Sequence, residues 1–241
     1  MENEEPFPQR NLSDHALTAL RHFYSEQDMQ KQRFEELKSV TEQSNSATRF
    51  SMDMFAEDWN ASQFWYSEDT AVALATELLS EATNDTQIAV ISAPSVFVQL
   101  KNLLNDDVIA HERPGIYLLE YDDRFSVFPE LHQYDFRQPL KLDPSLKGRF
   151  DRILCDPPFL SEDCQTKTAI TVRWLARTRG EEEKATSPRV LICTGERMEQ
   201  LIHRIYPGTR TTTFRPHHAQ DRLGNEFRCY ANYESNLWAL E

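Results

Sequence analysis

The residues best suited to chemistry form the tetrad Asp156-Pro157-Pro158-Phe159, which ends the apolar run FDRILC at residues 150–155. Two consecutive prolines have no backbone N–H donors and fixed φ angles, so they form a stiff, extended loop whose carbonyl groups can accept hydrogen bonds. The Asp156 carboxylate and the Pro157 carbonyl could hold the N–H bonds of an attacking amine. The Phe159 ring could stack on a flat base or contact an ammonium group. The tetrad therefore indicates chemistry on an amino nitrogen.

An ordinary turn at the end of a core strand is the alternative interpretation, because pairs of prolines are common in proteins. The tetrad, however, follows the fourth apolar run of a chain in which such runs alternate with helical patterns. Sheets of this kind bind ligands at the carboxyl ends of their strands. The position of the tetrad therefore favours the chemical interpretation.

Acidic side chains after the second and third apolar runs indicate a site for adenosine. Glu120 ends the second run, where a carboxylate can bind both hydroxyl groups of a ribose, and Tyr121 follows it. Asp122 competes with Glu120 for this role, and an ordinary acidic turn is the alternative for both. Asp135 and Phe136 follow the third run, where an acceptor and an aromatic ring could hold the adenine base. A loop acid beside a core phenylalanine explains this second pair equally well.

The loop Ser92-Ala93-Pro94-Ser95 follows the first apolar run and is the third candidate for contact with a cofactor. Nucleotide-binding folds usually place a glycine-rich loop here, because glycine lets the backbone approach the ligand closely. This chain has no glycine between residues 80 and 115. A G-x-G-x-x-G dinucleotide site is therefore excluded, although the small side chains of Ala93 and the two serines still permit a close approach.

Residues that could contact a substrate lie in two further segments. Three adjacent aromatic residues, Phe64, Trp65 and Tyr66, precede the first helix of the α/β pattern. These aromatic residues could cover the cofactor or shape the mouth of a substrate site, and core packing is the alternative. We predict that Trp65 and Tyr66 contact the substrate. The second segment flanks the closing strands and contains His217, His218, Asn225 and Arg228. We predict that Asn225 contacts the substrate, whereas a solvated polar face is the alternative for this group.

The segments that must position these residues alternate between strands and helices. Strands are predicted at 88–93, 116–122, 132–136, 150–156 and 189–195, helices at 68–80, 95–104, 161–177 and 196–205, and a final antiparallel pair at 211–218 and 226–234. Ser67 is the predicted N-cap of the first of these helices. Short apolar strands separated by helices indicate a mainly parallel sheet covered on both faces. Such a sheet with a terminal antiparallel pair is the layout of the Rossmann-like methyltransferases.

The first part of the chain differs in composition from the rest. Residues 12–37 predict a helix that becomes polar beyond Gln27, and residues 38–51 form a polar linker. We therefore predict two regions. An N-terminal helical extension with a flexible linker occupies residues 1–53, and a single α/β domain occupies residues 54–241.

The chain is strongly acidic. Its 39 acidic residues outnumber 26 basic ones, for a net charge of −13. Proteins that bind duplex nucleic acid usually present a basic face instead. The acidity therefore argues against nucleic acid as a partner and favours a basic protein, although a contribution to solubility alone is the alternative.

The sequence shows no sign of a metal site, a secretory signal or a membrane span. None of the four cysteines belongs to a C-x-x-C pair, so no zinc site is expected. The first residues are acidic and polar, and no apolar run approaches the ~20 residues of a membrane span. We therefore expect a cytoplasmic protein with reduced cysteines.

Seven stretches of the chain carry a further signal when they are taken together and in order. They are LSDHALTALRHFYSEQ, SQFWYSEDTA, ISAPSVF, LLEYDDRF, DPPFLSEDC, LICTG and LGNEFRCYANYE, and they are scattered over residues 12–237. Together they resemble the elongation factor 1-alpha lysine methyltransferase family, earlier described as N6-adenine-specific DNA methyltransferases. The tetrad DPPF alone is less specific, because many methyltransferases that act on adenine, glutamine or lysine share it.

This resemblance implies a class I methyltransferase fold with a seven-stranded sheet and S-adenosylmethionine as cofactor. It also implies a lysine ε-amine of translation elongation factor 1-alpha as the methyl acceptor. Glu120 would then hold the ribose, Asp135 and Phe136 would hold the adenine, and the backbone near Ser92 would lie under the cofactor. The DPPF tetrad would align the amine with the methyl group, and we expect alignment to matter more than base catalysis.

Two other functions fit part of the sequence. An adenine methyltransferase acting on DNA or RNA could use the same tetrad, because an exocyclic amine needs the same acceptors and a stacking wall, and the arginines between residues 204 and 228 allow it. A non-catalytic binding protein on the same scaffold is suggested by the absent glycine loop. The intact tetrad favours an enzyme.

Overall fold

The computed structural model describes residues 49–55, 63–106, 112–177, 187–220 and 226–241, and the separate positions Thr18, Arg21, Ser25, Met29, Gln32 and Glu35. The chain divides into two compact units, Met1–Gln43 and Ser44–Glu241. In the first unit, the six described positions are helical and their side chains are exposed. Most of the predicted linker lies outside the described residues, so the domain boundary at residue 53 stays a prediction.

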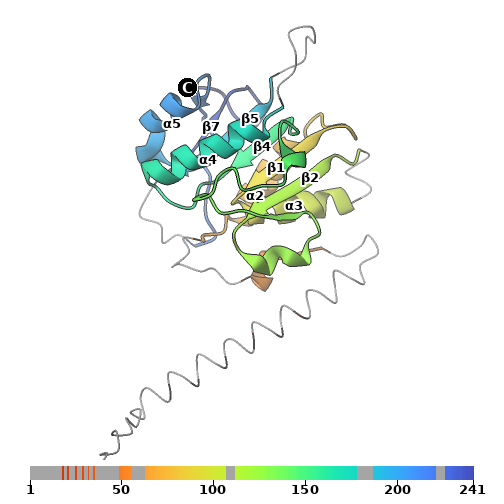
Figure 1. Ribbon diagram of the computed structural model, residues 1–241. Coiled ribbons are helices and arrows are strands. Elements are labelled where there is room, and N and C mark those ends of the chain that lie inside the picture. The colour runs from red at the N-terminus through yellow and green to blue at the C-terminus, as the bar shows by residue number, and fades with distance from the viewer. Residues whose placement is uncertain are drawn as a thin grey trace, which may run out of the picture. The chain divides into compact units, whose positions relative to one another are not determined.

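The second unit contains a seven-stranded sheet (Figure 1). In spatial order its strands are β3 (Leu131–Gln133), β2 (Gly115–Glu120), β1 (Gln87–Ile91), β4 (Arg152–Cys155), β5 (Arg189–Gly195), β7 (Phe227–Ala231) and β6 (Arg210–Thr211). Strands β1 to β5 are parallel, and β7 runs antiparallel to both β5 and β6. The predicted Rossmann-like fold, a mainly parallel seven-stranded sheet with a terminal antiparallel pair, is confirmed.

The terminal pair is shorter than predicted, because β6 ends at Thr211. Thr212 forms an isolated bridge with Leu240, and His218 forms one with Tyr66. The backbone after β6 thus pairs with two other segments of the chain and leaves the sheet. Residues 213–218 therefore reach the segment that precedes the α-helix at Glu68–Leu79.

Helices flank the sheet on both faces (Figure 1). The α-helices are α2 (Glu68–Leu79), α3 (Pro94–Asn105), α4 (Glu162–Leu175) and α5 (Glu199–Ile205), and the short 3-10 helices are η1 (Met52–Met54), η3 (Asp123–Val127), η4 (Pro144–Leu146) and η5 (Glu196–Met198). α2 and α3 contact each other, and α4 and α5 belong to the opposite layer. The Ser67 side chain accepts a hydrogen bond from the N–H of Thr70 at 3.3 Å, which confirms the predicted N-cap of α2.

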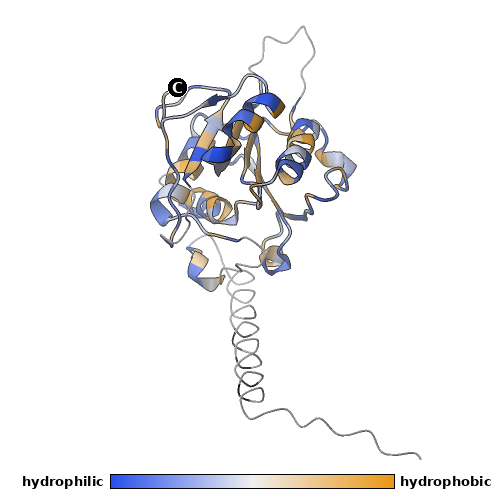
Figure 2. Cartoon of the chain, turned by 90° about the vertical axis from the view of Figure 1, so that its left-hand side faces the viewer, coloured by the Kyte–Doolittle hydropathy of each residue, from blue (hydrophilic) through white to orange (hydrophobic). Residues whose placement is uncertain are grey.

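A hydrophobic core cluster lies between the sheet and the α4–α5 layer. It joins Ala89 and Ile91 of β1 and Ile153 of β4 to Val172 and Leu175 of α4. Successive residues of a strand point to opposite faces of the sheet, so the strand residues that alternate with these core residues face α2 and α3. Figure 2 shows the hydrophobic residues concentrated on the central strands and the inward faces of the helices. Burial on both faces explains why the strands are continuous apolar runs.

Among the residues described by the structure, no helix has both the length and the apolar character that crossing a membrane would require. The same residues contain no group of three or more His, Cys, Asp or Glu side chains arranged to hold a metal ion. All four cysteines are free and buried. Two of them, Cys193 on β5 and Cys229 on β7, face each other with their Sγ atoms 3.2 Å apart.

Candidate active site

The candidate active site lies at the carboxyl ends of the strands, where the strand order reverses around β1. A cavity of about 540 Å³ opens there, within the range of about 300–1,000 Å³ typical of ligand sites. The predicted site residues that line it are Trp65, Ser92, Pro94, Glu120, Tyr121, Asp135, Phe136, Asp156, Pro157, Pro158 and Phe159. The structure thus brings together segments that are up to about ninety positions apart in the sequence.

Three predicted site residues are not among those that line the cavity. Ala93 is buried under the loop that enters α3, with 2% of its surface exposed. Tyr66 is also buried and lies behind Asp156. Asn225 lies outside the described residues, so its predicted contact with the substrate stays a prediction.

Ser92 supplies the backbone conformation that a glycine would usually provide in the loop after β1. Its φ angle is 54°, in the left-handed region that residues with a Cβ seldom adopt. Its N–H donates to the carbonyl of Leu119 at 2.9 Å, which holds the loop against β2. Pro94 then occupies the first turn of α3, where its lack of an N–H costs no hydrogen bond. The loop therefore turns sharply under the cavity without glycine, at a cost of roughly 1–2 kcal/mol.

Glu120 is the carboxylate that faces the cavity from β2. It is 6% exposed, and its Oε1 accepts hydrogen bonds from the N–H groups of Tyr121 at 2.8 Å and Asp122 at 3.2 Å. Burial raises the pKa of Glu120 to about 7. Asp122, the competing residue, caps η3 and pairs with Arg124, and it accepts a hydrogen bond from Gln63 at 2.9 Å. Asp122 thus carries these interactions and is not among the residues that line the cavity, whereas Glu120 is.

The loop after β3 places a charged pair and two aromatic rings at the cavity. Asp135 accepts from the backbone N–H and the Nε of Arg137, both at 2.9 Å, and this pairing holds the pKa of Asp135 below its usual range. The Arg137 guanidinium lies 5.6 Å from the centroid of the Tyr121 ring. The Phe136 ring lies 5.7 Å from that of Phe159. Phe136 and Phe159 therefore form a continuous aromatic wall between the loop after β3 and the tetrad.

Asp156 continues from β4 into the cavity. Its N–H donates to the carbonyl of Ile91 at 3.0 Å, which extends the pairing of β4 with β1 by one residue. Its side-chain Oδ2 accepts a hydrogen bond from the hydroxyl group of Tyr66 at 2.6 Å. Burial raises the pKa of Asp156 to about 7, the Tyr66 hydrogen bond opposes that rise, and the charge of Glu120 adds to it. A desolvated carboxyl group thus lies at the start of the stiff loop.

A buried side chain holds the far end of the tetrad. Gln165 of α4 is fully buried, and its Nε2 donates to the carbonyl of Phe159 at 3.1 Å and to Oγ1 of Thr194 at 3.0 Å. Gly195, at the end of β5, lies so close that an added Cβ would be 2.8 Å from a Leu160 methyl group. The loop is therefore pinned between α4 and β5, while Phe159 keeps 39% of its surface exposed.

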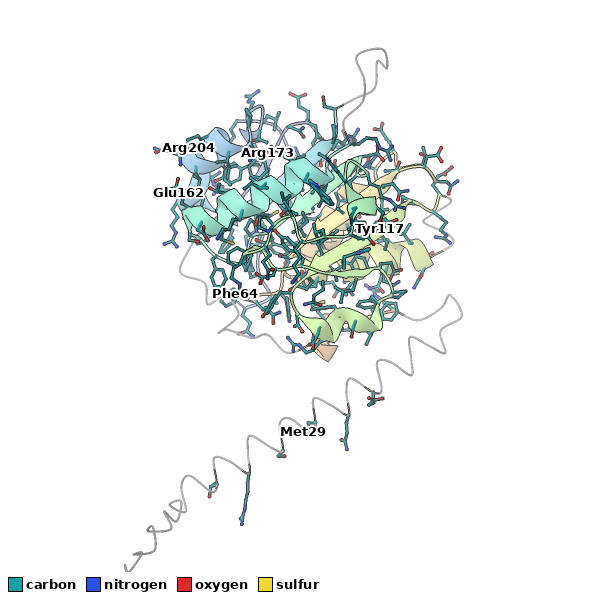
Figure 3. The ribbon with its side chains drawn as sticks, in the orientation of Figure 1. Met29, Phe64, Tyr117, Glu162, Arg173 and Arg204 are labelled. Atoms are coloured by element: carbon teal, nitrogen blue, oxygen red, sulfur yellow. The ribbon has the colours of Figure 1, made fainter. Side chains whose placement is uncertain are left out.

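The aromatic segment before α2 forms part of the wall of the cavity. Trp65 is 7% exposed, and its Nε1 donates to the carbonyl of Phe55 at 2.9 Å. Its ring lies edge-on to Phe125 with centroids 6.0 Å apart. Phe64 also lines the cavity (Figure 3). The segment is thus anchored to the core while one of its faces meets the ligand space.

Gln63, Phe64 and His218, which belong to the two segments predicted to contact a substrate, also line the cavity. The lining residues that the sequence analysis did not select are Tyr134, Arg137, Leu160, Arg197 and Phe227. His218 contacts the rings of Tyr66 and Phe227, with centroids 4.9 and 4.5 Å away. Burial lowers the pKa of His218 to about 4, so its ring is neutral at pH 7. The sequence showed His218 near the closing strands, but no local signal places it against a residue 152 positions earlier.

Away from the cavity, ion pairs join the helices of the α4–α5 layer. Glu162, in the first turn of α4, pairs with Arg204 of α5 (Figure 3). Arg173 of α4 donates to the carbonyl of Ile205 at 2.8 Å. Both arginines thus contact the neighbouring helix of this layer.

Comparison with known proteins identifies close relatives over most of the chain. The family model described as "Probable N6-adenine methyltransferase" matches residues 57–235. The Saccharomyces cerevisiae protein-lysine N-methyltransferase EFM5 is 40% identical, with 94% of this chain and 93% of that protein covered. EEF1A lysine methyltransferase 1 is 39% identical in Homo sapiens (94% and 93% covered) and 37% identical in Mus musculus (97% and 96% covered). The resemblance predicted from the seven scattered stretches is confirmed.

Proposed function

Since this chain belongs to the family of the EEF1A lysine methyltransferases, we propose that it transfers a methyl group from S-adenosylmethionine to a lysine of translation elongation factor 1-alpha. The observation that carries the proposal is the meeting of Glu120 and the tetrad Asp156–Phe159 in one cavity of about 540 Å³. One end of this cavity suits an adenosine, and the other end suits an amine. We further propose that the protein acts in the cytoplasm, where translation elongation takes place.

The residues of the cavity fit S-adenosylmethionine. Glu120 presents a buried carboxyl group for the ribose hydroxyls, and the turn at Ser92 lets the backbone run close beneath the ligand. Phe136 offers a ring for the adenine, and Asp135, paired with Arg137, offers acceptor lone pairs beside it. When bound, S-adenosylmethionine supplies an electrophilic methyl group on a sulfonium. In its ionised form, the Glu120 carboxylate would complement the positive charge of this ligand.

The tetrad would hold the acceptor amine. The Asp156 carboxylate and the Pro157 carbonyl accept its N–H bonds, and the exposed Phe159 ring contacts its methylene chain or its charge. A lysine ammonium with an ordinary pKa near 10.4 must lose a proton first, at a cost of roughly 4–5 kcal/mol at pH 7. Desolvation of the amine in this cavity lowers that cost. Holding the lone pair in line with the methyl group then supplies most of the rate.

Methylation of the N6 amine of adenine in nucleic acid is the second candidate, motivated by the description of the matching family model. The same acceptors and the same aromatic wall would suit an exocyclic amine. Nucleic acid would also need cationic groups around the mouth. Of the two arginines that line the cavity, Arg137 is paired with Asp135 and Arg197 donates to the carbonyl of Leu160 at 3.2 Å. With the net charge of −13, this arrangement favours the protein substrate.

Transfer of a radiolabelled methyl group tests the proposal. The purified protein is incubated with labelled S-adenosylmethionine and, separately, with elongation factor 1-alpha, single-stranded DNA, duplex DNA and RNA. Asp156→Ala serves as the control for the site. We expect label on the elongation factor, on a lysine identified by mass spectrometry, and none with the variant. Label on nucleic acid alone would establish the second candidate, and failure to bind the cofactor in calorimetry would leave a binding protein.

A further inference from the structure

Tyr66 contacts the reaction centre from behind. Its hydroxyl group lies 2.6 Å from Oδ2 of Asp156, yet only 3% of its surface is exposed and it is not among the residues that line the cavity. A side chain in this position does not face the ligand in this cavity. Its contact with the reaction centre is through the carboxylate of Asp156.

The Tyr66 ring is held in place by a segment from the other end of the domain. His218 lies against it with ring centroids 4.9 Å apart, and the two residues form an antiparallel bridge. Further backbone hydrogen bonds run from Ser67 to His217 at 2.9 Å and from Ala219 to Trp65 at 2.8 Å. The hydroxyl group is thus fixed by packing and by backbone pairing on both sides.

The two oxygens of Asp156 are not equivalent. Oδ2 is engaged by Tyr66, whereas Oδ1 accepts no hydrogen bond from any part of the chain that the structure describes. A short hydrogen bond to a carboxylate is among the stronger ones in proteins and restrains rotation of the carboxyl group. The pairing therefore leaves one oxygen, in a fixed orientation, for a ligand in the cavity.

We infer that Tyr66 is a positioning residue, whose hydroxyl group orients Asp156 so that Oδ1 and the Pro157 carbonyl together accept the N–H bonds of the amine. This inference rests on the proposed function for the identity of the amine. The contact itself does not depend on the acceptor. The sequence predicted that Tyr66 shapes the mouth of the substrate site. We infer instead that it supports Asp156 from the protein interior.

The hydrogen bond also affects the ionisation of Asp156. The titratable groups that interact with this carboxyl group are Tyr66, Glu120, Cys155, Cys164 and Cys193. Burial raises the pKa of Tyr66 well above its ordinary value, so the hydroxyl group remains a donor. Among these groups, Tyr66 lowers the pKa of Asp156 whereas Glu120 raises it. Loss of the hydroxyl group should therefore move the ionisation of Asp156 to higher pH.

The substitution Tyr66→Phe tests this role, with Tyr206→Phe as a matched control. Tyr206 is also buried, and its hydroxyl group has a weak contact with Sγ of Cys155 at 3.7 Å, away from the cavity. For Tyr66→Phe we expect kcat to fall roughly 10- to 100-fold, the effect of losing a hydrogen bond to a charged group. The KM for the protein substrate and the cofactor affinity should stay within about threefold of wild type. Tyr206→Phe should retain wild-type kcat.

Two pH titrations complete the experiment. The acidic limb of kcat against pH should move to higher pH in Tyr66→Phe, and so should the titration of Asp156 followed by NMR of ¹³C-carboxyl-labelled aspartate, with Asp156→Asn used for assignment. An unchanged kcat and titration in Tyr66→Phe, or an equal loss in Tyr206→Phe, would overturn the inference. A wild-type protein that methylates no lysine would instead refute the proposed function, and the NMR titration would still decide whether Tyr66 acts on Asp156.

Discussion

Replacing Glu120 with Gln should make the cofactor-free protein more stable at alkaline pH. Burial raises the pKa of Glu120 from 4.5 to about 7, and the side chain is 6% exposed. A raised pKa means that the folded state disfavours the ionised form, so stability is lost as pH rises from 4.5 through 7. The difference corresponds to about 3 kcal/mol once the group is fully ionised. Glutamine remains neutral and keeps an oxygen for the N–H groups of Tyr121 and Asp122, so it avoids that loss.

Thermal unfolding at several pH values measures this effect. At pH 8.5, Glu120→Gln should raise Tm by roughly 5–10 °C for a domain of this size. At pH 4.5, where wild-type Glu120 is largely protonated, the two proteins should unfold at nearly the same temperature. Calorimetry should show the opposite effect on ligand binding, with the affinity for S-adenosylmethionine reduced about tenfold or more because the charged acceptor is lost. Stability and binding would then be opposed at a single carboxyl group.

Asp122→Asn is the matched control, since it changes a carboxylate on the same turn. Burial raises the pKa of Asp122, but hydrogen bonds from Arg124 and Gln63 outweigh it and leave that pKa below its ordinary value. Its substitution should therefore lower Tm at neutral pH. A gain of stability in Glu120→Gln that is equally large at pH 4.5 and pH 8.5, or no gain at either pH, would refute the assignment of Glu120 as a desolvated ligand-binding carboxylate.

Three further substitutions test the tetrad. Asp156→Asn should reduce kcat roughly 10²- to 10³-fold in the methyl-transfer assay, with cofactor affinity by calorimetry within a few-fold of wild type; full turnover would exclude Asp156 from the reaction. Gln165→Leu removes the donor to the Phe159 carbonyl and should lower kcat about tenfold. A kcat equal to that of the wild type would mean that the loop needs no anchor. Gly195→Ala places a methyl group against Leu160. It should lower the free energy of unfolding, measured with denaturant, by about 1–3 kcal/mol and should raise KM. An unchanged free energy of unfolding would show that Leu160 moves freely.

The sequence was sufficient to predict the sheet and most of the residues around the cavity. Strands such as Gln87–Ile91 and Arg152–Cys155 are buried on both faces, so their apolar runs stand out from the amphipathic helices between them. Because parallel strands end at the same edge of a sheet, Glu120 and Asp156 could be placed together from their positions after strands alone. The shared cavity follows from that local rule.

Two features could not be predicted, for different physical reasons. The absence of glycine after β1 counted against a cofactor loop, but Ser92 adopts the left-handed conformation itself because its N–H is bonded to Leu119 across the sheet. The Tyr66 ring that contacts Asp156 packs against His218. Pairing between residues 152 positions apart leaves no periodic pattern in the sequence. Local patterns report which face a residue occupies, and they carry no information about which distant segment covers it.

The pairing of Tyr66 with His218 also determines when the site can form during folding. These residues are 152 positions apart, and closing a loop of that length costs on the order of 4 kcal/mol of chain entropy. Contacts of this kind form late, after the local β–α units have assembled. During synthesis, a chain that has not yet extended past residue 218 can contain the strands and the tetrad but not the support behind Asp156. The support behind Asp156 can therefore form only after residue 218 has been synthesised.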